Sequence, residues 1–480
     1  MHFCNQRTPH GDPELQLNGN AVQLVQETKF LGLIFDHKLS FIPHIKALKT
    51  KCLKALDLLK VLCSTEWGAD SEKLLHLYRS LVRSKLDYGS IVYGSARKSY
   101  IKMLDTVHHQ GLRLATGAFR TSPVQSLYVA CKEPSLEKRR LKLALQYVVK
   151  LGTNKTNPAY GCVFNSRDQE LYEKKPGYIK PLRFRIKDTL EELNVDLNTL
   201  VQSHFSEIPP WELAKPQVNL ELSKTKKSDT HPISYQEQFD NIRDEHPSHI
   251  AIYTDGSKED NKVAAAAVSR LGVSSRRIAG HSSIFTAEAH AIMMALAKME
   301  DSEEKDFFVF SDSKSCLQAL AHLKTDHPIV VQILDKLNAL KEENYDIHLC
   351  WVPGHVGLRG NELADRTAKK ALSGDVEPCP IPHTDVRPKI KRLVTKKWQE
   401  EWDEYPTNKL HHICPSVSET IQATPEKRKD QVVLTRCKIG HTRLTHAFLM
   451  QGEDAPECIP CQCPLTVKHI LLESIGFRDQ

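Results

Sequence analysis

The sequence predicts a mixed-sheet α/β domain over residues 248–374. Three apolar-rich strand patterns come first, at 249–255, 263–270 and 276–283, and the first two are expected to form a hairpin. Helices and strands then alternate, with strands at 305–312 and 346–352 and helices at 286–298, 313–323, 328–343 and from about 359. Consecutive strands followed by this alternation predict a mixed five-stranded sheet with flanking helices.

Residues 1–160 are predicted to be mainly helical. A short strand at 29–35, KFLGLIF, is expected to enter a turn directly afterwards. Apolar residues then recur at helical spacing at 43–63, 71–94, 100–119 and 134–151. The polar faces of these helices carry many cations, including Lys46, Lys49, Lys51, Arg79 and Arg83. These side chains are candidates for phosphate contacts, and an ordinary solvated face explains each one equally well.

Residues 161–247 and 375–480 lack this regularity. The first segment gathers Pro, Lys and Glu, as in SEIPPWELAKPQ, and is expected to be a partly ordered linker. The second contains a basic helix at 387–405 with two tryptophans and a further basic stretch at 434–449. We expect it to form a small basic helical tail that ends in a Cys/His motif.

The composition narrows the setting. The 480 residues carry a net charge of +7, which mildly favours a polyanionic partner. The 13 cysteines follow no framework and are odd in number, which argues against a secreted disulfide scaffold. Neither a signal-peptide pattern nor an apolar run of about 18 residues is present. We therefore expect an intracellular protein, in the cytoplasm or nucleus, without a membrane partner.

Four carboxylates in the α/β segment are candidates for catalysis. Strands are expected to end at Asp255 and Asp312, while Glu288 and Asp365 lie near the starts of helices. The carboxyl ends of strands are where open α/β sheets place their sites. Four converging carboxylates need counter-cations, and two Mg²⁺ ions would satisfy them and support phosphodiester hydrolysis.

Each carboxylate also has an ordinary interpretation. Asp255 suits a turn, Asp312 a helix N-cap, Glu288 the positive end of a helix, and Asp365 a solvated surface. Their joint order and context favour the metal site.

Four segments resemble the type 1 ribonuclease H family. They are YTDGS, FTAEAHAI, VFSDSKS and WVPGHVGLRGNELAD, in the family's chain order and within residues 249–374. The resemblance implies a ribonuclease H-like fold and hydrolysis of the RNA strand of RNA–DNA hybrids. It assigns Asp255, Glu288, Asp312 and Asp365 to binding two Mg²⁺ ions, or Mn²⁺ in their place, with no small-molecule cofactor.

The same resemblance suggests further roles. His355 matches a histidine of a flexible loop that handles a proton or product release, and Gly354 and Gly357 would let this loop move. Asn361 matches a position that holds substrate. Ser257, in the turn after the first carboxylate, is a second candidate for substrate contact. Selectivity for RNA requires recognition of the 2′-hydroxyl, which distinguishes RNA from DNA.

The N-terminal block resembles another part of the same kind of polyprotein. FLGLIFDHKLSF and LYRSLVRSKLDYGSIVYGSA resemble the palm end and the thumb-like helices of reverse transcriptases from jockey-like non-LTR retrotransposons, over about residues 1–160. The family's Asp-Asp motif is missing, because no two adjacent aspartates occur in the chain. We therefore expect a truncated retrotransposon product without polymerase activity.

The C-terminal segment contains a zinc-like motif. Cys458, Cys461 and His469 have the C-x2-C-x7-H spacing of a small zinc site. Similar retroelement tails place another Cys after the histidine and four intervening residues, where this chain has Ser474. Cys463 is an awkward substitute because it lies so close to Cys461. We expect a degenerate motif, and binding of Zn²⁺ stays open.

These observations lead to a primary functional hypothesis and two alternatives. The primary hypothesis is a two-metal endonuclease that cleaves the RNA of RNA–DNA hybrids, within a retrotransposon-derived fragment. The first alternative is a catalytically idle remnant that binds nucleic acid. The second keeps the fold and cuts duplex DNA instead.

Overall fold

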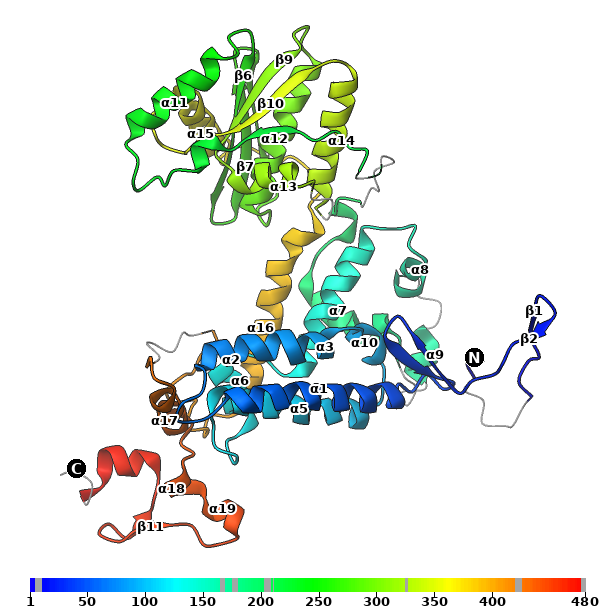
Figure 1. The fold of residues 1–480 in the computed structure, drawn as a ribbon, viewed down its shortest axis with the longest axis vertical. Helices are drawn as coiled ribbons and strands as arrows, with labels where there is room; N and C mark the ends of the chain where they lie inside the picture. The colour runs from blue at the N-terminus through cyan, green and yellow to red at the C-terminus, as the bar shows by residue number, and fades with distance from the viewer. Residues whose placement is uncertain are drawn as a thin grey trace. The chain divides into compact units, whose positions relative to one another are not determined.

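The computed structural model describes residues 1–4, 11–164, 169–174, 180–202, 209, 211–323, 327–418 and 425–475 (Figure 1). The chain divides into two compact units. The helical unit comprises residues 1–147, 166–193 and 390–480, and the sheet unit comprises 148–165 and 194–389. The sheet unit therefore includes residues on both sides of the predicted 248–374.

The helical unit begins with two hairpins and continues as helices. The hairpins are β1 (Gln16–Leu17) with β2 (Asn20–Ala21) and β3 (Glu27–Phe30) with β4 (Leu33–Asp36). The helices that follow are α1 (Ile42–Leu62), α2 (Ser71–Tyr78), α3 (Ser84–Asp87), α4 (Ser90–Tyr93), α5 (Lys98–Thr116), α6 (Val124–Cys131), α7 (Leu136–Gly152), α9 (Gln169–Lys174) and α10 (Leu182–Leu193). The C-terminal part adds α16 (Arg387–Asp403), α17 (Arg428–Ile439), α18 (Arg443–His446), α19 (Phe448–Gln451), β11 (Glu457–Cys458) and β12 (Cys463–Pro464).

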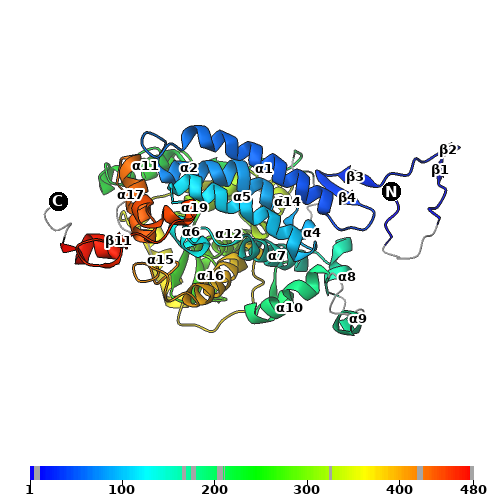
Figure 2. The same ribbon diagram turned by 90° about the horizontal axis from the view of Figure 1, so that it is seen from below.

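One apolar core holds the helical unit together. Helices α1 and α5 lie side by side in both views (Figure 1, Figure 2). Ile45, Leu56 and Leu59 of α1 are fully buried in this core. Trp398 and Trp402 of α16 belong to the same cluster. The two tryptophans of the basic helix therefore stabilise the core.

Two expectations for this unit were wrong. The segment 29–35 is a hairpin, because Leu31 and Gly32 have φ values of 44° and 84° and form a two-residue turn between β3 and β4. The helix expected at 71–94 is interrupted by a π-helical turn at Arg79–Arg83 and by a break at Gly89, which has a φ of 66°. Apolar periodicity continued across both breaks and concealed them.

The sheet unit contains a six-stranded mixed sheet in the order β5-β10-β9-β6-β7-β8. Its strands are β5 (Gln217–Asn219), β6 (Ile250–Glu259), β7 (Lys262–Ser269), β8 (Gly272–Ile278), β9 (Asp306–Ser311) and β10 (Asp346–Trp351). The pairs β6–β7 and β7–β8 are antiparallel, and the other pairs are parallel. Its helices are α8 (Pro158–Phe164), α11 (Pro232–Asp244), α12 (Ile284–Glu300), α13 (Lys314–Ala321), α14 (Pro328–Glu342) and α15 (Arg359–Ala371).

Helices cover both faces of this sheet (Figure 1). Residues of α12, α13 and α14 share one apolar cluster with the strands, while α11 packs into a second cluster around Phe308 and Phe310. The first turn of α15 lies against Tyr253, because a Cβ at Gly360 would come within 2.2 Å of that ring. The arrangement confirms the predicted mixed sheet with flanking helices.

The sheet has one strand more than expected. This strand lies in the segment that was expected to be a partly ordered linker, so that expectation is corrected too. Strand β5 lies within 161–247 and pairs with β10, with Val218 opposite Leu349. From the same segment, α11 buries Tyr235, Phe239 and Ile242. Residues 217–244 are therefore part of the sheet unit. Among the described residues, no helix is long and apolar enough to cross a membrane.

Candidate active site

Asp255 of β6 and Asp312, the residue directly after β9, lie at neighbouring positions of two adjacent parallel strands. Thr254 of β6 pairs with Ser311 of β9, so the next residue along each chain is one of the two aspartates. The expectation that β6 ends at Asp255 was wrong, because the strand continues to Glu259 by pairing with β7. Asp312 follows directly after the last residue of β9, as expected.

Glu288 reaches this position from α12. Ser283 caps the helix by accepting a hydrogen bond from the backbone N–H of Thr286, so Glu288 lies in the second turn. A Cβ at Gly256 would lie 2.8 Å from the backbone nitrogen of Glu288. The glycine therefore lets α12 approach β6 closely, and its backbone N–H donates to the Glu288 carboxylate.

The structure brings three carboxylates into one cluster. Asp255, Glu288 and Asp312 each offer an oxygen within 4.8 Å of the others. Asp255 is 5% exposed and Glu288 is 7% exposed. The buried Oε2 of Glu288 has no hydrogen-bond partner in the described part of the chain. A buried carboxylate oxygen without a donor is an unfavourable arrangement that a cation would relieve.

The electrostatics of the cluster also favour a bound cation. Burial, together with the charges of Asp312 and Asp365, raises the pKa of Asp255 to about 7. Burial and the charges of Asp312 and Asp255 raise the pKa of Glu288 well above its ordinary value. Burial also raises the pKa of Asp312. Oxygen ligands that repel one another in this way are the donor set that a hard divalent cation fits.

Asp365 lies near this cluster without joining the group of three. It is on α15, and its Oδ2 accepts from Lys369 Nζ at 2.8 Å. Its charge acts on the pKa of both Asp255 and Asp312. The lysine thus neutralises the fourth carboxylate, while none of the other three forms an ion pair with a described residue.

Two candidate substrate contacts border the cluster. Asn361, at 3% exposure, donates from its side chain to Asp312, while its Oδ1 is buried with no hydrogen-bond partner among the described residues. That oxygen is a free acceptor. Ser257 lies two residues after Asp255 in β6, so both residues are on the same face of the strand.

His355 lies on an exposed loop between β10 and α15. A protonated His355 would lower the pKa of Asp312, so the ring is close to that carboxylate. A Cβ at Gly354 would lie 2.6 Å from Asp312 Oδ2. Gly354 is therefore required for close approach, while Gly357 adopts a φ of 87°, which favours glycine.

Two residues that the sequence did not reveal hold this loop. Lys227 Nζ donates to the carbonyl oxygen of Gly354 at 2.6 Å. Gln236 Nε2 donates to the carbonyl oxygen of Val356 at 2.7 Å. Both belong to the expected linker and bracket His355 on either side. Contacts to backbone carbonyls leave no motif, so no sequence signal could have identified them.

A third unforeseen residue fixes the helix that carries Glu288. Asp385, at 6% exposure, accepts from the backbone N–H of Ser283 at 2.9 Å and from Thr286 Oγ1 at 2.6 Å. Both donors belong to the start of α12. Asp385 lies eleven residues beyond the predicted end of the domain at 374.

The zinc-like motif is assembled at the C-terminus of the helical unit. Cys458, Cys461 and His469 each offer a ligand atom within 4.8 Å of the others. Ser474 Oγ lies 3.5 Å from Cys458 Sγ, and hydrogen bonds from Ser474 and His469 lower the pKa of Cys458 to about 7. Cys463 Sγ lies 3.6 Å from His469 Nδ1. Ser474 and Cys463 thus both lie next to the cluster of Cys458, Cys461 and His469.

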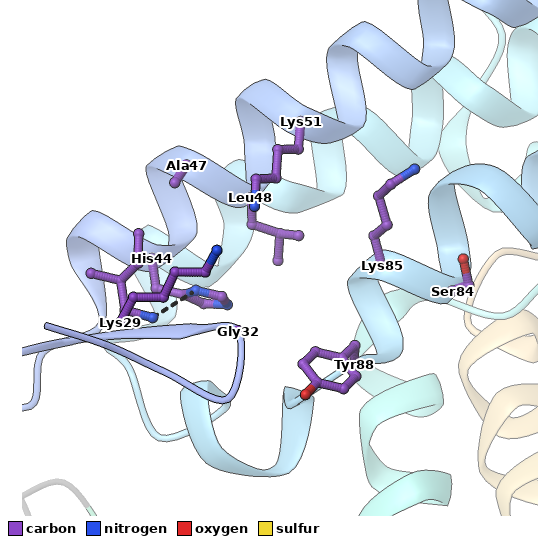
Figure 3. A pocket seen from close by; sticks show the side chains of 10 residues that line it. Lys29, Gly32, His44, Ala47, Leu48, Lys51, Ser84, Lys85 and Tyr88 are labelled. Atoms are coloured by element: carbon purple, nitrogen blue, oxygen red, sulfur yellow. Dashed lines mark hydrogen bonds between the residues drawn. The ribbon is translucent and has the colours of Figure 1, made fainter.

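Cationic side chains of the helical unit line two pockets. The first, of about 450 Å³, is lined by Lys29, Lys51 and Lys85 and has no carboxylate among its lining residues (Figure 3). The second contains Arg79 and Arg83, which bind Glu133 at 2.6 and 2.5 Å. Lys46 and Lys49 lie on α1 and line neither pocket. Arg79 and Arg83 are therefore engaged by an internal carboxylate, whereas Lys51 borders an open pocket.

Comparisons with known proteins agree with this geometry. Residues 247–373 match the family model of RNase H. A Pol polyprotein of equine infectious anemia virus (strain Wyoming) is 32% identical over 147 residues, 29% of this chain and 12% of the viral protein. An RNA-directed DNA polymerase from the mobile element jockey of Drosophila melanogaster is 27% identical over 146 residues, 30% of this chain and 16% of that protein.

A further relative belongs to another retroelement. A Pol polyprotein from the type-1 retrotransposable element R1 4 of Nasonia vitripennis is 23% identical over 116 residues, 24% of this chain and 30% of that protein. The chain thus spans less than a third of the length of these relatives. Residues 247–373 thus match the RNase H family model, and the chain is similar over 116 to 147 residues to polyproteins and polymerases of retroelements and a retrovirus.

Proposed function

We propose that this chain hydrolyses the RNA strand of RNA–DNA hybrids by a two-metal mechanism. The observation that carries the proposal is the buried cluster of Asp255, Glu288 and Asp312, in which Glu288 Oε2 has no hydrogen-bond partner among the described residues. We assign these three residues and Asp365 to holding two Mg²⁺ ions, or Mn²⁺ in their place. Bound there, the ions would supply Lewis acidity for attack on the phosphodiester and for stabilising the leaving oxygen.

The remaining groups position the substrate and move protons. His355, exposed on its loop near Asp312, is assigned to proton transfer at the leaving 3′-oxygen. Asn361 Oδ1 is a buried acceptor without a partner in the described structure, and we assign it to the 2′-hydroxyl of the RNA strand. Ser257 is assigned to the same strand from β6.

The helical unit is assigned a supporting role. Its pocket lined by Lys29, Lys51 and Lys85 is suited to phosphate groups of the hybrid. The chain contains no adjacent pair of aspartates, and we propose that it has no polymerase activity of its own. The alternative is a remnant that binds nucleic acid without cutting it, and the cationic pocket is the observation that favours it.

The test is cleavage of a hybrid by the full chain in Mg²⁺. A labelled RNA–DNA hybrid should be cut in its RNA strand, and the Asp312→Asn variant should leave it intact. Duplex DNA of the same sequence should not be cut. Binding of the hybrid without cleavage by the parent chain would favour the alternative, and equal cleavage by the variant would contradict the assigned site.

A further inference from the structure

A second cluster of side chains that can bind a metal lies at the beginnings of the parallel strands, at the end of the sheet away from the catalytic carboxylates. Parallel strands β6, β9 and β10 begin at this end with Ile250, Asp306 and Asp346, and β6 and β9 lead to the catalytic carboxylates. Asp255 is the fifth residue after Ile250, which corresponds to roughly 16 Å along a strand. The two clusters are therefore separate sites.

Three histidines form the core of this second cluster. His246 and His249 come from the turn between α11 and β6, and His348 comes from β10. One ring nitrogen from each lies within 4.8 Å of the others. The ring centroid of His246 lies 4.9 Å from that of His249 and 4.8 Å from that of His348.

A carboxylate completes the group. Asp346 Oδ2 lies 3.0 Å from His249 Nε2 and 3.3 Å from His348 Nε2. Asp306 lies close by, since His249, Asp306 and Asp346 form a second group with ligand atoms within 4.8 Å. Phe308 packs against all three imidazoles, with ring centroids 5.1 to 5.4 Å away. The apolar ring limits the directions in which the histidines can turn.

Hydrogen bonding alone does not account for the arrangement. Asp346 provides acceptors for His249 and His348, but neither ring nitrogen of His246 has a hydrogen-bond partner among the described residues. A third imidazole placed against two others gains no hydrogen bond and would repel them if protonated. Converging nitrogens with one carboxylate are, in contrast, a common ligand set for transition metals.

We propose that His246, His249, His348 and Asp346 form a binding site for a transition-metal cation of the Zn²⁺ class. Three imidazoles and one carboxylate match the four-coordinate preference of Zn²⁺, with Zn–N distances of about 2.0–2.1 Å. Small rotations of the side chains bring atoms now within 4.8 Å to that spacing. Mg²⁺ is a poor candidate because it prefers oxygen ligands.

The consequence of binding would be structural. The site joins the turn before β6 to the start of β10, two segments about a hundred residues apart that do not pair directly. A cation held there would fix the beginnings of the parallel strands. It would stabilise the folded unit by a free energy that rises with the logarithm of the ratio of cation concentration to Kd. The catalytic carboxylates, at the other end, would keep their own ions.

The experiment uses the full chain with Cys458→Ser, Cys461→Ser and Cys463→Ser, which removes the thiols next to His469. Excess Mg²⁺ is present to fill the carboxylate cluster. Titration with Zn²⁺ should show one bound ion and a rise in Tm. His246→Ala should reduce the affinity by more than about 100-fold, as expected for a lost ligand. The exposed His322→Ala, in the same unit, should leave binding unchanged.

Co²⁺ spectra distinguish the histidine site from the C-terminal Cys/His motif, and circular dichroism tests whether the variant is folded. Here the Co²⁺ spectra of the parent chain, with its cysteines intact, and of its His246→Ala variant are compared. The variant should lose visible bands of the parent, while the thiolate charge-transfer bands should be the same in both. The circular dichroism of the metal-free variant should match that of the parent. Absence of Zn²⁺ binding in the cysteine variant with native circular dichroism, or equal binding by His246→Ala, would overturn the proposal.

Discussion

The side-chain amide of Gln236 donates a hydrogen bond to the backbone carbonyl of Val356 at 2.7 Å. It thereby fixes the residue that follows His355. Gln236→Leu should remove this bond while keeping the apolar contacts of α11. A lost hydrogen bond is worth about 1 kcal/mol, so we expect kcat for hybrid cleavage to fall about fivefold, with a smaller change in KM.

The matched control for this prediction is Gln238→Leu. Gln238 is exposed on the same helix, two residues further on. This variant should cleave like the parent. Equal kcat for all three proteins would show that the Gln236 bond does not position the loop.

The parts of the fold that were predicted share a common physical basis. Strands β6 and β9 and helix α12 are long enough for their apolar pattern to be recognised in the sequence. Asp255 and Glu288 lie on these elements, and Asp312 follows β9 directly. Strand β5 has only three residues and one apolar side chain, Val218, so no periodicity could reveal it. It exists because β10 offers an unpaired edge.

The missed contacts have a different cause. Lys227, Gln236 and Asp385 act through the backbone or through the first turn of a distant helix. Such bonds depend on tertiary placement and not on local sequence. Conversely, Trp398 and Trp402 lay on a basic helix that could have served nucleic acid, yet both are in the core.

The raised pKa values predict how stability depends on pH in the absence of metal. The pKa of Asp255 is about 7 in the folded chain, and that of Glu288 is also raised, so the folded state binds protons that the unfolded state has lost. The free energy of unfolding should therefore fall as the pH rises from about 4 through about 7. A rise of one pKa unit corresponds to about 1.4 kcal/mol.

Urea unfolding in EDTA, compared at about pH 5 and about pH 8, measures this dependence. Mg²⁺ should restore stability at the higher pH because it binds the ionised carboxylates. Asp255→Asn should unfold with a shallower pH dependence and should not cleave the hybrid. A stability of the metal-free parent that increases over this interval would contradict the prediction.

Asp385 should be required for stability of the domain although it lies beyond residue 374. Asp385→Ala removes the acceptor of the Ser283 N–H and the Thr286 hydroxyl. A buried donor that loses its acceptor costs about 1–3 kcal/mol, so Tm should fall and hybrid cleavage should weaken as α12 loosens. Asp375→Ala, an exposed aspartate ten residues earlier, is the control and should be neutral. An unchanged Tm for Asp385→Ala would show that Asp385 does not stabilise the start of α12, the helix that carries Glu288.

Ser474→Cys should convert the degenerate C-terminal motif into a complete zinc site. Ser474 is 2% exposed, and its Oγ lies 3.5 Å from Cys458 Sγ, within the cluster of Cys458, Cys461 and His469. A thiolate there gives the Cys₃His ligand set of structural zinc sites, whereas a serine hydroxyl is a weak ligand. Co²⁺ titration should show stronger thiolate charge transfer per bound ion, and Zn²⁺ should compete for the site at lower concentration than in the parent. Ser418→Cys, at an exposed position of the same unit, adds a thiol away from the cluster and should leave the spectrum unchanged. If Ser474→Cys bound Co²⁺ no more tightly than the parent, the serine would not be the defect in the motif.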